Sequence, residues 1–142
     1  MKLKLTFLVL GVFLLSCGTK VRNSSGKDNQ VKYQQVAEKS LGAGIDCTKN
    51  NSETYVLCVN EGTGSSEQPR KMLSFMVIRT SDNKVMLEQK VDGGTVNWYS
   101  DNEIEVFTIP GIMGRDQTKD DYTLIYNVVS GESSPKKGVQ AK

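Results

Sequence analysis

Three acidic residues closely follow the only tryptophan of the chain: Asp101, Glu103 and Glu105 come after Trp98. On an extended strand, Glu103 and Glu105 point to the same face. Paired carboxylates beside an aromatic ring occur in glycan recognition and in glycoside hydrolysis. Apolar residues alternate with the two glutamates, which is also typical of a strand with a solvated outer face. We therefore predict a possible ligand-contact face at these four residues, without catalysis.

The sequence contains no histidine. Ser-His-Asp and Cys-His nucleophile systems are thereby excluded, as is a zinc ion bound by histidine. The Ser-x-x-Lys spacing occurs at Ser81 and Lys84 and again at Ser133 and Lys136, but in polar sequence that would not desolvate the lysine. We expect no catalytic residues, and we do not expect an enzyme.

Metal and cofactor sites are not expected either. Two cysteines without a histidine lack the ligands that a tetrahedral zinc site requires. Asp116, Asp120 and Asp121 could bind calcium through their oxygens, but their spacing fits no calcium-binding loop, so a solvated loop is the favoured interpretation. The glycine-rich residues 62–66 lack the Lys-Ser or Lys-Thr pair of a phosphate-binding loop.

Cys47 and Cys58 lie in two short strand-like segments that flank a run of turn-forming residues. If these segments pair as a hairpin centred between Ser52 and Glu53, the two cysteines lie directly opposite each other. Cross-strand neighbours are close enough for a disulfide in an oxidising compartment. A disulfide is the favoured prediction, and two buried reduced cysteines are the alternative.

The elements that position these residues are mainly strands. Met72 to Arg79 is apolar on nearly both faces, and pairing Arg79 with Lys84 across the next turn would place Met76 opposite Leu87. The fold class expected is a small antiparallel meander or sandwich of about seven strands. The strands are expected at 45–48, 55–59, 72–79, 84–91, 95–100, 103–109 and 122–129.

One short N-terminal helix is expected at 31–42. Tyr33, Val36, Ala37 and Leu41 would share one helix face, and Gly42 is placed to end the helix. A strand at 31–36 is the alternative.

The first 17 residues form an export signal. Lys2 and Lys4 precede an apolar segment of about 11 residues, which is too short for a membrane-spanning helix of roughly 20. The segment ends in Leu14-Leu15-Ser16-Cys17. This tetrapeptide resembles the lipobox of bacterial lipoproteins, although a plain secretory signal is the rival interpretation.

The resemblance implies that Cys17 receives a diacylglycerol and that the chain is cleaved before it. The partner of Cys17 is then the lipid bilayer, and two or more acyl chains hold such a protein stably. Gly18 follows the cysteine where an aspartate would favour the inner membrane, so the resemblance favours the outer membrane of the cell envelope.

Four regions follow from these patterns: a signal peptide at 1–16, a lipidated cysteine with a flexible polar tether at 17–30, a β-rich exported domain at 31–130 and a polar C-terminal tail at 131–142. Lys2 and Lys4 leave with the signal, so 16 of the 18 basic residues remain against 16 acidic ones. A neutral chain without a basic stripe gives no reason to expect nucleic-acid binding.

Two functions are compatible with this organisation. The first is a non-catalytic envelope lipoprotein that binds a protein or glycan, or serves as an accessory module. The second is a lipid-anchored inhibitor of a hydrolase such as a lysozyme or a protease. The second function needs a protruding loop that enters an active-site cleft, and the candidates are residues 111–121 and 67–70.

Overall fold

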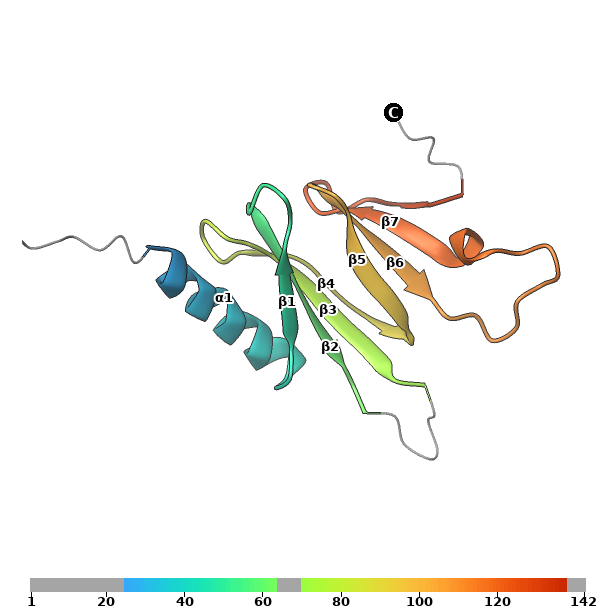
Figure 1. The fold of residues 1–142 in the computed structure, drawn as a ribbon, viewed down its shortest axis with the longest axis horizontal. Coiled ribbons are helices and arrows are strands. Elements are labelled where there is room, and N and C mark those ends of the chain that lie inside the picture. The colour runs from blue at the N-terminus through green and yellow to red at the C-terminus, as the bar shows by residue number, and fades with distance from the viewer. Residues whose placement is uncertain (1–24, 64–69, 138–142) are drawn as a thin grey trace, which may run out of the picture.

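The computed structural model of the protein describes residues 25–63 and 70–137 (Figure 1). This part of the chain begins with helix α1 (Ser25–Leu41) and continues through eight strands in two antiparallel four-stranded sheets. The mainly β, antiparallel fold with one N-terminal helix is thus confirmed, with eight strands in place of seven. Within the described ranges, no helix is long and apolar enough to cross a membrane.

The first sheet is a meander in which strands adjacent in the sequence are also adjacent in space. Its edge strand β1 is the shortest of the four and contains no buried residue, whereas β3 is buried along most of its length. The four strands are β1 (Asp46–Lys49), β2 (Tyr55–Glu61), β3 (Met72–Arg79) and β4 (Val85–Asp92).

The second sheet is also a meander, and it begins almost where the first ends. Gly93 alone separates β4 from β5, and a Cβ atom on Gly94, the first residue of β5, would lie 1.9 Å from the carbonyl oxygen of Phe107. Only glycine therefore allows this close passage from one sheet to the other. The strands are β5 (Gly94–Ser100), β6 (Glu103–Thr108), β7 (Thr123–Asn127) and β8 (Ser133–Pro135), and the 3-10 helix η1 (Lys119–Tyr122) precedes β7.

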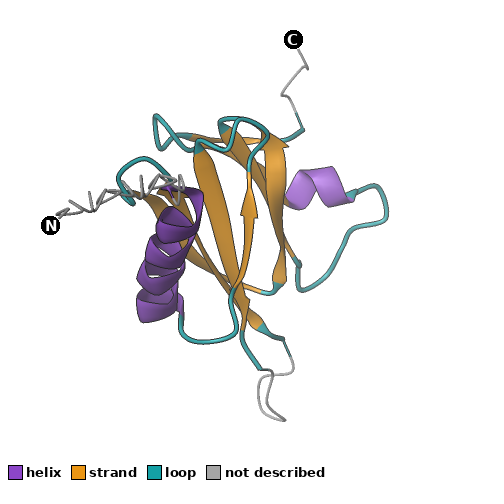
Figure 2. Ribbon diagram, turned by 60° about the vertical axis from the view of Figure 1, so that its left-hand side comes forward, coloured by secondary structure: helices purple, strands orange, loops and turns teal. Residues whose placement is uncertain are grey.

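The inner faces of the two sheets share one hydrophobic core, and α1 covers the opposite face of the first sheet. Figure 2 shows α1 and η1 on opposite sides of the strands. The fold therefore has two apolar layers, one between the sheets and one under the helix. The buried residues between the sheets are Tyr55, Leu57, Leu73, Phe75, Val77, Val96, Ile104, Val106 and Val128. Those under the helix are Tyr33, Ala37, Val56, Cys58, Met76 and Ile78.

The helix face predicted from the sequence is confirmed. Tyr33 and Ala37 are buried against the sheet, Val36 and Leu41 pack beside them, and Gly42 follows the last helical residue with a φ of +90°. The helix begins at Ser25 rather than at residue 31, however, so residues 25–30, which the sequence assigns to the tether at 17–30, are helical. Extending a helix that packing already stabilises costs far less than starting one, so a polar segment joins it.

The register predicted for β3 and β4 is wrong beyond the turn. Ile78 pairs with Val85 as expected, but Val77 pairs with Leu87, so Met86 is a bulged residue and Met76 faces Glu88. A shift of one residue exchanges the two faces of a strand. The bulge moves Leu87 to the core between the sheets and Glu88 to the helix side, where it accepts a hydrogen bond from Ser40 Oγ.

The polar tail predicted from residue 131 contains the eighth strand. Asn127 reverses the chain: its side-chain oxygen accepts hydrogen bonds from the amides of Val129 and Ser130, and Gly131 follows with a φ of +75°. β8 then pairs with β7. Backbone pairing needs no apolar side chain, which is why composition alone predicts a tail here.

Candidate functional site: a groove between two sheet edges

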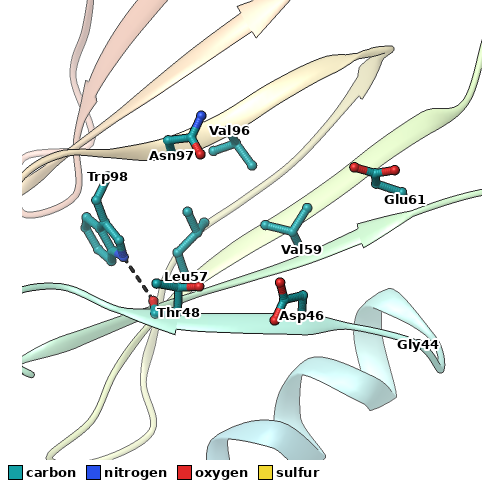
Figure 3. Close-up of a pocket in the computed structure, with 9 residues that line it drawn as sticks. All are labelled: Gly44, Asp46, Thr48, Leu57, Val59, Glu61, Val96, Asn97 and Trp98. Carbon is teal, nitrogen blue, oxygen red and sulfur yellow. Dashed lines mark hydrogen bonds between the residues drawn. The ribbon is translucent and has the colours of Figure 1, made fainter.

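An open groove of about 440 Å³ lies where edge strand β1 of the first sheet faces edge strand β5 of the second (Figure 3). Its described lining mixes apolar, amide, hydroxyl and carboxylate groups. The residues are Gly44, Asp46, Thr48, Leu57, Val59, Glu61, Val96, Asn97 and Trp98.

The groove is the part of the inner face of β1 and β2 that the second sheet leaves uncovered. Thr48 pairs with Leu57, and Asp46 pairs with Val59, so all four share the inner face. Leu57 is buried, Val59 is half-buried, and the two β1 residues are exposed. Asp46 and Thr48 thus lie on the inner face of the sheet but beyond the edge of the hydrophobic core, where polar residues are tolerated.

Trp98 closes one end of the groove. Tyr99 is a bulged residue of β5, so Trp98 pairs with Ile104 and packs against the core between the sheets. Its indole Nε1 donates a hydrogen bond to the carbonyl oxygen of Thr48 at 2.9 Å. This bond joins the two sheets across their edges, as Figure 3 shows.

A second connection beside Trp98 fixes the two hairpin turns relative to each other. Asn50 is buried, and its Nδ2 donates to the carbonyl oxygen of Asp101 at 2.8 Å while its Oδ1 accepts from the amide of Tyr55 at 3.0 Å. The amide of Ser52 donates to the carboxylate of Asp101 at 3.1 Å. Sequence reasoning missed Asn50 as a positioning residue; an asparagine in a turn of this kind is the only local indication.

The remaining part of the groove is acidic. Asp46 and Glu61 are its only charged residues among the described lining, and Figure 3 shows them away from Trp98. Lys71 Nζ lies 3.8 Å from Glu61 Oε2, and both side chains are mostly exposed. The site can therefore attract a cation, and the apolar side chains beneath can bury an aliphatic group.

The structure does not bring the predicted ligand-contact residues onto one surface. Trp98 faces inward, whereas Glu103 and Glu105 lie on the outer face of the second sheet. Glu103 accepts a hydrogen bond from Ser100 Oγ at 2.9 Å, and Glu105 Oε2 lies 3.0 Å from Lys136 Nζ. The bulge at Tyr99 causes this separation because it turns Trp98 away from the glutamates. Ligand contact by Asp101, Glu103 and Glu105 stays a prediction.

Two of the three carboxylates considered for calcium, Asp120 and Asp121, take part in hydrogen bonds or ion pairs. Asp121 accepts from the amide of Thr118 at 2.8 Å and lies 2.6 Å from Lys137 Nζ, and Asp120 lies 3.3 Å from Lys136 Nζ. The hydrogen bond from Lys137 is the main cause that lowers the pKa of Asp121. Across the ranges that the structure describes, no group of three or more metal-binding side chains occurs.

The predicted disulfide between Cys47 and Cys58 is present. The two residues are direct partners of β1 and β2, with their Cα atoms 4.1 Å apart, in the hairpin register that the sequence predicts. The bond fixes the edge strand that borders the groove. The lipidation site predicted at Cys17 lies outside the described residues.

A second feature is the loop 110–118 between β6 and η1, which presents apolar side chains to solvent. Ile112 is 89% exposed and Met113 is 47% exposed. Tyr122 and Gln117 hold this loop in shape: the Tyr122 hydroxyl donates to Gln117 Oε1, which also accepts from the amide of Gly114, and the same hydroxyl lies 3.5 Å from the carbonyl oxygen of Ile112. The other predicted loop falls at residues 67–70, of which only Arg70 is described.

The chain matches no protein-family model, no curated protein sequence and no solved structure.

Proposed function

We propose that the protein is a membrane-anchored lipoprotein of the bacterial cell envelope that acts as a non-catalytic binding or accessory module. The observation that carries this proposal is the groove between β1 and β5. The lipobox-like sequence at Leu14 to Cys17 supports the anchor and the location. The absence of histidine from the sequence supports a role in binding rather than in catalysis.

The construction of the groove supports binding. Hydrogen bonds from Trp98 to Thr48 and from Asn50 to Asp101 join the two sheets at one end, and the Cys47–Cys58 disulfide fixes the edge strand. A site whose walls are held in place before the partner arrives loses little conformational entropy on binding. Its mixed lining of apolar floor and carboxylate groups is typical of sites that select a ligand by shape and charge.

A pull-down from crosslinked native envelopes tests this function. Thr48→Tyr places a large side chain in the groove from an exposed position, so recovery of the partner should fall about tenfold or more, as at a central interface position. Thr95→Tyr is the matched control, since Thr95 is exposed on edge strand β5 and does not line the groove. Equal recovery with both variants would exclude the groove as the binding site.

A second comparison in the same experiment tests the anchor. Cys17→Ala removes the predicted acylation site. The protein should then move from the membrane fraction to the soluble fraction, and a partner that requires anchoring should be lost with it. Retention of the Cys17→Ala protein in the membrane fraction would contradict lipid anchoring at this residue.

The exposed loop 110–118 favours a second candidate function, a lipid-anchored inhibitor of a hydrolase. Ile112 is held outward on a shaped loop, and Figure 1 shows this loop at the opposite end of the longest axis from the start of α1. A loop so placed can reach a cleft away from the anchored end. The purified protein should slow a lysozyme or a protease at micromolar concentration, and Ile112→Ser should abolish the effect. No inhibition across a panel of hydrolases would exclude this function.

A further inference from the structure

We propose that the groove binds an extended, cationic peptide segment of a partner protein, which adds as a new strand to the free edge of β1. This inference rests on the proposed function, because it takes the groove as the binding site and names the chemistry of its occupant. Three features support it: the free backbone edge of β1, the acidic side chains of the lining, and the packing and hydrogen bonding of Trp98.

Among the described residues, the backbone of β1 has hydrogen-bonding groups along one edge that pair with no other strand. In the described part of the chain, β1 pairs with β2 alone. The amide of Asn50 donates to the carbonyl oxygen of Tyr55 at 3.0 Å, so the hydrogen-bonded pairs of this antiparallel ladder alternate from there. Cys47 and Cys58 then form a non-hydrogen-bonded pair, and their Cα separation of 4.1 Å agrees with the short spacing of such pairs.

It follows that the N–H and C=O groups of Cys47 and Lys49 point away from β2, toward the free edge. A strand laid beside β1 can satisfy these four groups, as in other cases of recognition by strand addition. Lys49 does not obstruct the groove, because it pairs with Val56 of the helix-side layer and its ammonium lies 2.6 Å from Glu53. The disulfide holds β1 against β2, so the position of the free edge is fixed before a strand binds to it.

The lining specifies the side chains of the incoming strand. Alternate residues of that strand would point into the groove, over the apolar surface of Leu57, Val59 and Val96. Asp46 and Glu61 are the charged groups of the described lining, and both are acidic. An apolar residue followed at strand spacing by a lysine or arginine fits this surface, because the cation can meet the carboxylates while its neighbour covers the floor.

The state of Trp98 favours a peptide over a glycan. Glycan sites commonly use an aromatic ring whose face is free and whose polar edge can bond the sugar. Trp98 instead packs against the core, and its indole N–H already donates to Thr48. Because Trp98 is engaged in this way, the free edge of β1 and the carboxylates of Asp46 and Glu61 are the main recognition groups.

The test uses the full lipidated protein in detergent micelles and a labelled heptapeptide, Val-Thr-Lys-Thr-Val-Thr-Lys, whose valine and lysine side chains alternate along one face of an extended strand. Binding is measured by fluorescence anisotropy at low salt and again at physiological salt. The same peptide with glutamate in place of lysine should bind about tenfold more weakly or not at all, because its charges repel Asp46 and Glu61. Equal affinity for the two peptides would overturn the charge assignment.

Backbone methylation tests the strand addition itself. In a paired strand, alternate amides face the neighbouring strand, so N-methylation at one set of alternate positions should reduce affinity about tenfold, and methylation at the other set should leave it within about threefold. Equal effects of the two methylated peptides would overturn pairing with β1, because contact through side chains alone carries no such alternation.

Protein variants locate the site. Asp46→Asn with Glu61→Gln should weaken the valine-lysine peptide about fivefold to tenfold, which is the range for loss of partly exposed charge pairs at a binding site. Asp92→Asn with Glu132→Gln is the matched control, since both residues are exposed and outside the groove. A peptidoglycan fragment that binds in a Thr48→Tyr-sensitive manner, while neither peptide binds, would overturn the peptide assignment but keep the groove function. If Thr48→Tyr leaves the recovery of envelope partners unchanged, the groove function falls as well.

Discussion

The outer faces of the two sheets are covered in different ways. Helix α1 covers the first sheet through apolar contacts, with Tyr33 and Ala37 buried against Met76 and Ile78. The 3-10 helix η1 lies at the outer face of the second sheet, on the opposite side of the molecule (Figure 2). Ion pairs hold this cover: Lys136, which follows edge strand β8, lies 3.0 Å from Glu105 of β6 and 3.3 Å from Asp120 of η1.

This difference indicates that the two covers contribute unequally to stability. Burial of apolar side chains stabilises a fold in proportion to the area removed from water, and salt does not screen it. Ion pairs that remain partly exposed contribute little and weaken as salt rises or carboxylates protonate. We therefore expect the helix cover to unfold with the whole protein and the ionic cover to open locally.

The largest effect is expected under the helix. Ile78 is fully buried, so Ile78→Ala should lower the free energy of unfolding by about 2–5 kcal/mol in a denaturant titration. Ile112→Ala is the matched control, and its 89% exposure predicts a change within about 0.5 kcal/mol. Similar losses for the two variants would contradict the burial assigned to the helix side.

A smaller loss is expected from removal of the disulfide, which lies beside the same layer. The bond closes a loop with a sequence separation of 11, and Cys47→Ala with Cys58→Ala should cost about 3 kcal/mol, chiefly because the unfolded chain gains freedom. The measurement is a denaturant titration of this variant and of the wild type under reducing conditions. The reduced wild type should lose a similar amount of unfolding free energy. An unchanged midpoint on reduction would show that the bond does not form in the purified protein.

The ionic cover of the second sheet should contribute less to the free energy of unfolding. Lys136→Met removes the ion pairs to Glu105 and Asp120. Hydrogen bonds to these two carboxylates are also the main reason that the pKa of Lys136 is raised. The side chains of Lys136 and Glu105 are 29% and 23% exposed, so the global loss should stay below about 1 kcal/mol. Hydrogen exchange should speed up in residues 119–136 and not in α1. Lys84→Met, at an exposed lysine of the β3–β4 turn, is the control.

The smallest effect concerns pH. Lys137 lowers the pKa of Asp121 below its usual value of 3.8, so the stabilisation is present above that value and is lost as the pH falls through the lowered pKa. Lys137→Met should raise the pKa of Asp121, as an NMR titration of the carboxyl carbons would show. Asp82, in the turn between β3 and β4, serves as the internal control, because the hydrogen bond from Arg79 lowers its pKa to about 2 and should still do so. An unchanged pKa of Asp121 would contradict the ion pair.

Local patterns predicted much of this fold. The bounds of β3 follow from its apolar run between turn-forming segments, and the Cys47–Cys58 pair follows from the centre of one hairpin. Both depend on residues close together in the sequence. The single-residue bulges at Met86 and Tyr99 could not be predicted in this way, because they depend on which face the neighbouring strand must bury.

The groove could not be predicted for a related reason. Asp46 and Glu61 look like ordinary surface residues of separate strands, and only the packing of one sheet on the other makes them line one groove with Trp98. The sequence did suggest Trp98 as a binding residue, but with Glu103 and Glu105, which the bulge at Tyr99 places on the other face. The useful local indication was the shortness of β1, whose polar residues cannot belong to a core.

The disulfide also determines how the protein responds to mechanical force. Tension applied at the start of α1 would first pull the helix from the sheet, and then act on β1 as the next element of the chain. Extraction stops at Cys47, because its covalent bond passes the load to Cys58 in the middle of β2. A chain pulled from its N-terminal side therefore keeps β1 attached to β2, and with it the edge strand that borders the groove.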